Sequence, residues 1–151
     1  MQNLGDFFSD ALKEQLADDN FKIGAVLKYP VSFTNPPKSK RLIIIGFDRH
    51  KVVMAVVLVN SEINPQVFPT PQLKNLHLEL DTNNRHFLEH TSYVDCSKIW
   101  TQDALTIKNL IATDPNIHIG ELSNADLIDV LDKIKNAPNI TPKEKKRFGF
   151  I

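Results

Sequence analysis

Arg41 and Ser61 are the two residues whose types and spacing best support a chemical role. Two β-branched apolar runs, 42–45 and 52–59, flank the polar turn 48–51, and this pattern predicts a β-hairpin buried on both faces. Because hairpin strands are antiparallel, the residue entering the first strand lies near the residue leaving the second. We therefore expect a guanidinium beside a hydroxyl. Such a pair can hold anionic oxygen atoms, since the guanidinium donates paired hydrogen bonds and the hydroxyl adds another.

Length and composition bound the protein class. The chain has 151 residues, about one domain, and its 42% hydrophobic and 24% charged residues are typical of a globular protein. Its 18 basic and 18 acidic side chains cancel, so binding of nucleic acid would need a local basic patch. Residues 1–10 lack a signal-peptide layout, a lone cysteine excludes an internal disulfide framework, and no apolar run approaches the ~20 residues that span a bilayer. The sequence predicts a cytoplasmic protein with no membrane partner.

The first part of the chain is predicted to contain a helix, a strand and a loop ahead of the hairpin. Apolar residues recur every three or four positions over residues 3–17, which predicts an amphipathic helix. That helix either packs on the domain or is bound by a partner protein. Residues 21–28 predict a strand with a bulge or close backbone approach at Gly24. The prolines in 29–40 and 63–72 predict loops.

Short strands and a closing helix are predicted for the second half. Residues 76–80 alternate between apolar and polar, which predicts a half-buried strand with His77 and Glu79 facing solvent. Residues 91–99 and 117–119 predict further short strands, and 105–111 a helix or strand. Together with a helix at each end, these strands describe a small barrel or strongly bent sheet.

The last part of the chain combines a helix with a basic tail. Ser123 is a suitable N-cap for a helix over residues 124–136, and Pro138 ends it. The tail 137–151 has four basic residues and two phenylalanines close together. Either the tail grips an RNA strand, or it is a solvated end whose aromatic side chains dock on the domain.

The order of several short motifs resembles the MazF/PemK toxin family. The first half contains FKIG, PVSFTN and then KSKR directly before an aliphatic strand, at residues 21–24, 30–35 and 38–41. The second half contains SYVDCS and IGELS, at residues 92–97 and 119–123, followed by the closing helix. The resemblance covers about residues 21–136.

This resemblance implies a fold, an activity and partners. Members of that family are small, partly open SH3-like β-barrels that form homodimers, cleave single-stranded RNA without metal or cofactor, and are blocked by an antitoxin protein. The expected organisation is an N-terminal helix in residues 1–20, the barrel with its closing helix in 21–136, and the basic tail in 137–151.

The resemblance also implies roles for individual residues. Arg41 falls where the family has its catalytic arginine, and Ser61 falls near its catalytic threonine. Attack by a ribose 2′-hydroxyl passes through a phosphorane with extra negative charge, which a guanidinium is suited to hold. Proton transfer also needs an acid or base, and His86, His50 and Asp95 are the open candidates.

Four residues are the expected RNA contacts: Lys38, Lys40, Ser97 and Lys98. The sequence departs from the family at two positions, because Ala25 stands where an acidic residue is usual and Leu42 where a proline is usual. Asp95 and Ser97 also fall near the place of an arginine–aspartate pair, without its cation. The alternative is therefore a non-catalytic barrel that binds a protein partner or RNA.

Other chemically capable residues favour structural interpretations. His86 and His90 have the spacing of one helix face, but a third ligand or CxxC motif is missing nearby, so surface histidines are expected and no metal. Cys96 is expected to be a small buried hydrophobe. Trp100 is expected to be a core or interface anchor, with stacking on a base as the alternative.

Overall fold

The structure is a computed structural model that describes residues 19–34 and 36–151. The strands are β1 (Ala25–Val31), β2 (Lys38–Phe47), β3 (Val53–Asn60), β4 (His77–Leu80), β5 (Ser92–Asp95), β6 (Trp100–Asp103) and β7 (His118–Glu121). The helical elements are α2 (Pro71–Lys74), α3 (Ala104–Thr113), the 3-10 turn η2 (Pro115–Ile117), α4 (Asn124–Asn136) and α5 (Pro142–Arg147). The helix expected over residues 3–17 lies outside the described residues. Within the described ranges, each helix is too short or too polar to cross a bilayer.

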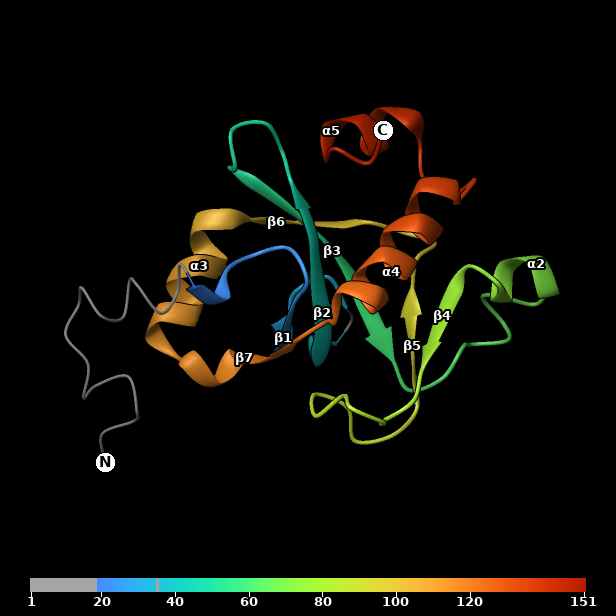
Figure 1. The fold of residues 1–151 in the computed structure, drawn as a ribbon, viewed down its shortest axis with the longest axis horizontal. Coiled ribbons are helices and arrows are strands. Elements are labelled where there is room, and N and C mark those ends of the chain that lie inside the picture. The colour runs from blue at the N-terminus through green and yellow to red at the C-terminus, as the bar shows by residue number, and fades with distance from the viewer. Residues whose placement is uncertain (1–18, 35) are drawn as a thin grey trace.

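The strands form one curled antiparallel sheet, a half-barrel with helices on both faces (Figure 1). Its order is β4-β5-β3-β2-β1-β7, and β6 pairs with β3 beyond the end of β5. The register shifts between Ile44 and Gly46 and between Val26 and Leu27. Such bulges bend strands and increase their twist, which is how this sheet curls. The expectation of a strongly bent sheet is confirmed.

The hairpin of β2 and β3 is the centre of the sheet. Its register pairs Arg41 with Val59 and Phe47 with Met54. One face packs under α4 and the C-terminal segment, and the other packs under α3 and η2. Figure 1 shows α4 crossing the near side of the sheet. The predicted hairpin, with both faces buried, is therefore confirmed.

Local signals explain the helix boundaries. The Ser123 hydroxyl accepts a hydrogen bond from the Asp126 backbone N–H at 3.1 Å, so α4 begins where the N-cap predicts. The ambiguous stretch 105–111 is helical in α3. Asp103 caps that helix by accepting from the Thr106 backbone N–H at 2.9 Å, and Ile107 and Ile111, one turn apart, face the core.

The expectation that His77 faces solvent is wrong. The side chain is 1% exposed and its Nε2 lies 3.7 Å from Asp95 Oδ1. Phe68, from the loop before α2, places its ring edge-on against the imidazole, with 4.4 Å between the ring centroids. The alternating pattern identified the strand correctly, but this loop covers His77, while Glu79 on the same face is exposed.

Two-sided burial of the hairpin leads to a stability prediction. Ile43 and Ile44 are adjacent, point to opposite faces, and are both 0% exposed. Truncating either to alanine should therefore lower the free energy of unfolding by about 2–5 kcal/mol, because each leaves a cavity in a packed layer. Urea denaturation of each variant measures this. Val52→Ala is the control, since Val52 is 56% exposed. If Ile43→Ala or Ile44→Ala costs no more than the control, one face is not a packed core.

Candidate functional site

Arg41 is held in place at the start of β2. Its Nε donates a hydrogen bond to the Phe87 carbonyl at 2.9 Å, and its Nη2 lies 3.5 Å from Glu89 Oε1. The Arg41 side chain is 20% exposed, whereas Glu89 is 76% exposed. The Arg41 guanidinium is thus oriented by a main-chain carbonyl, which cannot rotate away as a side-chain acceptor could. Its remaining N–H groups have no acceptor among residues 19–34 and 36–151, so they can donate to an anionic ligand.

The loop that binds Arg41 joins β4 to β5 and is tied to α4 by a charge pair. Arg85 donates to Asp126 through two parallel hydrogen bonds, from Nε to Oδ2 at 2.8 Å and from Nη2 to Oδ1 at 2.9 Å. Arg85 Nη1 also donates to Asp81 Oδ1 at 2.9 Å. Asp126 is 8% exposed, and the hydrogen bonds from Arg85 hold the pKa of its carboxyl below its ordinary value. This pair anchors the base of the loop.

Phe87 anchors the middle of the same loop. It is 6% exposed and belongs to the core under α4. Gly120 in β7 lies so close that a Cβ there would be 2.9 Å from Phe87 Cδ1. The absence of a side chain at this position lets the ring pack on the sheet, which places the Phe87 carbonyl against Arg41.

Ser61 follows β3 directly, two residues beyond the strand partner of Arg41. It is exposed. Residues two apart on an extended chain point to the same side, so the backbone register is compatible with the expected pairing of Arg41 and Ser61. Within the described part of the chain, no hydrogen bond joins the two side chains. Lys40, which alternates to the other face, donates to Asn60 Oδ1 at 3.2 Å.

The three candidates for proton transfer lie on three different parts of the fold. His86 is exposed and lies next to Phe87 in the loop that binds Arg41. His50 lies at the hairpin tip, at the other end of β2 (Figure 1). Asp95 lies on β5 next to Val94, which is the strand partner of Val59, so its side chain points to the face opposite that of Arg41. Of the three, only His86 is near Arg41 in the fold.

Asp95 belongs instead to a separate pocket, which residues of the C-terminal segment also line. The pocket has a volume of about 570 Å³, and its lining includes Asp95, Ser97, Lys98 and Trp100. Asp95 Oδ1 accepts from both the backbone N–H and the hydroxyl of Ser97. The expected RNA contacts therefore divide between two places, with Lys38 and Lys40 at the start of β2 and the other two in this pocket.

Trp100 has both ring faces covered. Phe33 stacks on it with 4.3 Å between ring centroids, and Lys98 Nζ lies 3.8 Å from its centroid. Two contacts this close require opposite faces of the indole. Trp100 thus packs as a structural anchor, and a base would have to displace Lys98 to stack on it.

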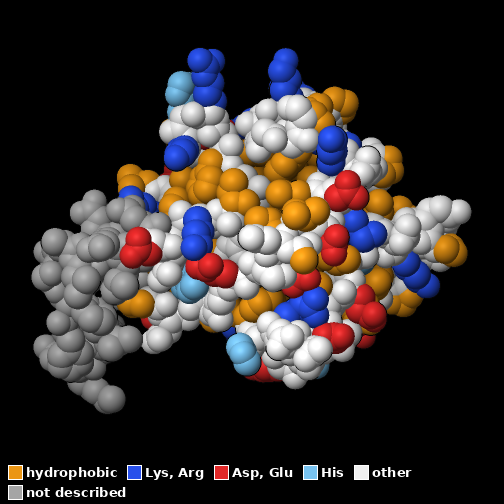
Figure 2. All heavy atoms as spheres, in the orientation of Figure 1, with side chains coloured by type: hydrophobic (Ala, Val, Ile, Leu, Met, Phe, Trp, Pro, Cys, Tyr) orange, Lys and Arg blue, Asp and Glu red, His pale blue; other side chains and the backbone are white. Residues whose placement is uncertain are grey.

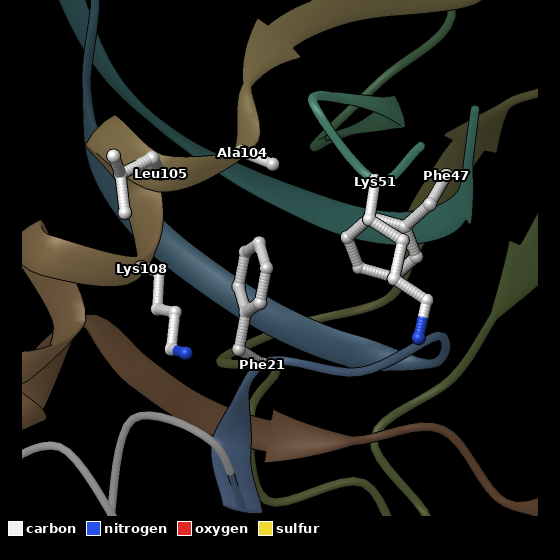
Figure 3. A pocket seen from close by; sticks show the side chains of 6 residues that line it. All are labelled: Phe21, Phe47, Lys51, Ala104, Leu105 and Lys108. Carbon is white, nitrogen blue, oxygen red and sulfur yellow. The ribbon is translucent and has the colours of Figure 1, made fainter. Parts of the chain in front are cut away.

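A second pocket, of about 420 Å³, lies against α3 (Figure 3). It is lined by Phe21, Phe47, Lys51, Ala104, Leu105 and Lys108. Among the residues that the structure describes, this lining includes no carboxylate, imidazole or hydroxyl. The lining is mostly apolar, and its two lysines, Lys51 and Lys108, are its charged groups.

The remaining candidates for thiol or metal chemistry are Cys96 and the pair His86 and His90. Cys96 is 0% exposed, and burial raises the pKa of its thiol to about 12, so the reactive thiolate is not formed near neutral pH. His86 and His90 lie in a loop, so they do not share a helix face. In the described ranges, no three His, Cys, Asp or Glu side chains are grouped to hold a metal ion.

Comparison with known proteins adds no family assignment. No protein-family model matches this chain, and no curated protein matches it. The motif resemblance to the MazF/PemK family therefore remains a prediction.

The Arg85–Asp126 pair predicts a pH-dependent contribution to stability. Because the folded-state pKa of Asp126 is lowered, the pair stabilises the fold fully above the ordinary carboxyl pKa of about 4, and this stabilisation is lost as pH falls through the lowered pKa. Asp126→Asn should cost about 3 kcal/mol at pH 7, since the guanidinium loses its better buried, bidentate partner and keeps only the exposed Asp81. Urea denaturation should show that the difference in unfolding free energy between the variant and wild type narrows as pH falls below about 4. Asp129→Asn, at an exposed position of the same helix, is the control. A gap that stays constant with pH would contradict the assignment.

The contact between Gly120 and Phe87 predicts a coupled pair of substitutions. Gly120→Ala should lower the free energy of unfolding by about 1–3 kcal/mol, because the new methyl group overpacks the ring. Phe87→Leu should cost less in the Gly120→Ala background than in wild type. Thermal denaturation of the two single variants and the double variant measures this coupling. Additive changes in the free energy of unfolding would show that residues 87 and 120 are not in tight contact.

Proposed function

We propose that this protein is a metal-independent endoribonuclease of the MazF/PemK toxin type, built on an SH3-like barrel and acting on single-stranded RNA. The observation that supports this function best is the anchored Arg41 guanidinium. It is largely buried, oriented by the Phe87 carbonyl, and placed where β2 begins and β3 ends. A preorganised cation with N–H groups left over is what stabilisation of a phosphorane requires.

In the proposed reaction the ribose 2′-oxygen attacks the adjacent phosphorus. The bond from phosphorus to the 5′-oxygen breaks, which leaves a 2′,3′-cyclic phosphate on one fragment and a 5′-hydroxyl on the other. One proton leaves the 2′-hydroxyl and one reaches the 5′-oxygen. No electrons are exchanged with a cofactor.

Each residue near Arg41 has a distinct role in this proposal. Arg41 donates to the non-bridging oxygens as their charge grows. Ser61, exposed just after β3, adds a hydroxyl donor. His86, in the loop that orients Arg41, transfers a proton. Lys40 and Lys38 attract the neighbouring phosphates from the other face of β2, while Asp95, Ser97 and Lys98 line a separate pocket and have no role in this step.

The proposed function also concerns where the protein acts and which proteins it binds. As the resemblance implies, the enzyme acts in the cytoplasm as a homodimer, and an antitoxin protein inhibits it by blocking the RNA-binding surface. A carboxylate from such an inhibitor would compete for the same N–H groups of Arg41 that the phosphorane needs.

One observation favours the second candidate, a non-catalytic barrel that binds a protein partner or RNA. The Glu89 carboxylate lies 3.5 Å from Arg41 Nη2 and neutralises part of the charge that catalysis would use. Glu89 is 76% exposed, so an incoming phosphate can displace it at small cost. Under this second candidate, Arg41 binds an acidic group without any cleavage.

The Arg41→Ala variant tests the nuclease proposal. With end-labelled single-stranded RNA and a chelator, wild-type protein should produce fragments ending in 2′,3′-cyclic phosphate. Arg41→Ala should reduce the cleavage rate by a factor of about 100 or more, the usual effect of losing one preorganised oxyanion donor.

Three further variants make that test specific. Arg41→Lys should fall between wild type and Arg41→Ala, because lysine keeps the charge and loses the paired donors. Glu89→Gln should retain or raise activity. Lys74→Ala, an exposed cation on α2, is the matched control and should leave the rate unchanged. Equal cleavage by Arg41→Ala and wild type would remove Arg41 from the mechanism, and no cleavage by wild type would favour the binding protein.

A further inference from the structure

Two basic segments that are far apart in the sequence meet at one end of the molecule. The β2–β3 turn contributes Arg49, His50 and Lys51, all exposed. Helix α5 contributes four basic residues: Lys143, Lys145, Lys146 and Arg147. In Figure 2, Lys and Arg side chains stand on the two projections at the top of the view, which are the hairpin tip and α5 in Figure 1. A chain with no net charge thus has one strongly basic end.

Packing holds α5 next to the hairpin. Phe148, directly after α5, is 5% exposed and belongs to the core under α4. Its carbonyl would lie 3.0 Å from a Cβ at Gly46, so the two backbones touch just below the hairpin tip. Arg147 lies over the Phe148 ring, 5.0 Å from its centroid. The two projections are therefore fixed relative to each other.

The acidic residues at this end are already engaged. Asp48 accepts hydrogen bonds from the backbone N–H groups of Val52 at 2.9 Å and Val53 at 3.2 Å, which order the turn. Glu144 accepts from the Thr141 hydroxyl at 3.2 Å at the start of α5. Across the described residues, no carboxylate lies within ion-pair distance of the six Lys and Arg side chains of the two segments. Their charge is available to a partner.

Hydrophobic surface lies between and below the two projections (Figure 2). Beside α5, a groove of about 300 Å³ is lined by Ile128, Leu131, Asp132 and Lys135 of α4 and by Gly149 and Phe150, and Phe150 is partly exposed. The basic side chains of the hairpin tip and α5 thus surround apolar and aromatic surface, with Asp132 and Lys135 at the groove as well.

We propose that the hairpin tip and α5 form a binding surface for single-stranded RNA, with phosphates on the two basic projections and bases against the recessed apolar surface. This combination of a basic rim with aromatic contact is how proteins bind single strands without reading their sequence. A membrane would touch the projections and leave the recessed apolar area uncovered. A duplex has its bases stacked inside, so the apolar area would gain nothing.

The surface lies at the opposite end of β2 from Arg41. The two are separated by six residues of strand, from Arg41 to Phe47, which is about 20 Å. The choice of RNA as the ligand rests on the proposed function, but binding here does not require cleavage. An RNA strand that touches both places would be bound here through nucleotides far from the reacting phosphate. This second contact would raise affinity without altering the cleavage reaction.

Binding is measured with a fluorescent 2′-O-methyl oligouridylate of about twenty nucleotides, because its blocked 2′-oxygen cannot attack phosphorus. Anisotropy titrations between about 50 and 200 mM salt compare full-length wild type with Arg49→Gln/Lys143→Gln/Lys146→Gln. Loss of three phosphate contacts should weaken binding at least tenfold and reduce the slope of log K against log salt by about 2, from about 0.7 per contact. Lys22→Gln/Lys74→Gln, which removes cations from other exposed places, should bind like wild type.

Several outcomes would overturn this assignment. A wild-type protein that binds no oligonucleotide is one such outcome, and an equal loss of affinity in the triple variant and the control is another. Tighter binding of vesicles containing about 30% anionic lipid, with the same dependence on the three cations, would assign the surface to a membrane. Equal binding of poly-glutamate of similar charge would assign it to an acidic protein segment. Failure of the nuclease proposal can be told apart from failure of this one. Unmodified RNA would then stay intact, whether or not the protein binds the 2′-O-methyl oligouridylate.

Discussion

The β2–β3 hairpin imposes the main constraint on this fold, because both of its faces are apolar. Such a hairpin is stable in water only when each face is covered, and here α4 with the C-terminal segment covers one face while α3 and η2 cover the other. Polar chemistry is thereby excluded from the middle of both strands. It is confined to their ends, with Arg41 and Lys40 at one end and the basic turn after Phe47 at the other.

Placement of Arg41 depends on contacts made far from it in the sequence. Its carbonyl partner is 46 residues away, and the loop carrying that carbonyl is tied to α4 by an ion pair between residues 41 positions apart. Gly120, on a third element, gives the Phe87 ring room to pack. The guanidinium therefore has a defined direction only when the sheet, the loop and α4 are all assembled. An exposed arginine on a mobile side chain would have lost that preorganisation.

The features that sequence reasoning predicted are those decided by neighbouring residues. The hairpin follows from two apolar runs around a polar turn, and the start of α4 follows from one serine with the apolar spacing behind it. By contrast, Glu89 and the Arg85–Asp126 pair have no local signature, because each partner comes from another element. The prediction for His77 was wrong for a related reason. Alternation describes the strand by itself and cannot show that the loop carrying Phe68 covers the His77 side chain. Likewise, alternation along β5 separates Asp95 from Arg41, although both were candidates for one site.

Burial of Cys96 has a practical consequence for the energetics of this chain. A protonated thiol without solvent access does not react with disulfide reagents, so modification has to wait for a fluctuation that uncovers the sheet beneath α4. No other cysteine competes for the reagent. Cys96 is thus a natural probe for the fluctuation that uncovers the sheet beneath α4. The rate at which one sulfur is consumed, compared with the rate for a free thiol, yields the equilibrium between closed and open forms without an engineered label.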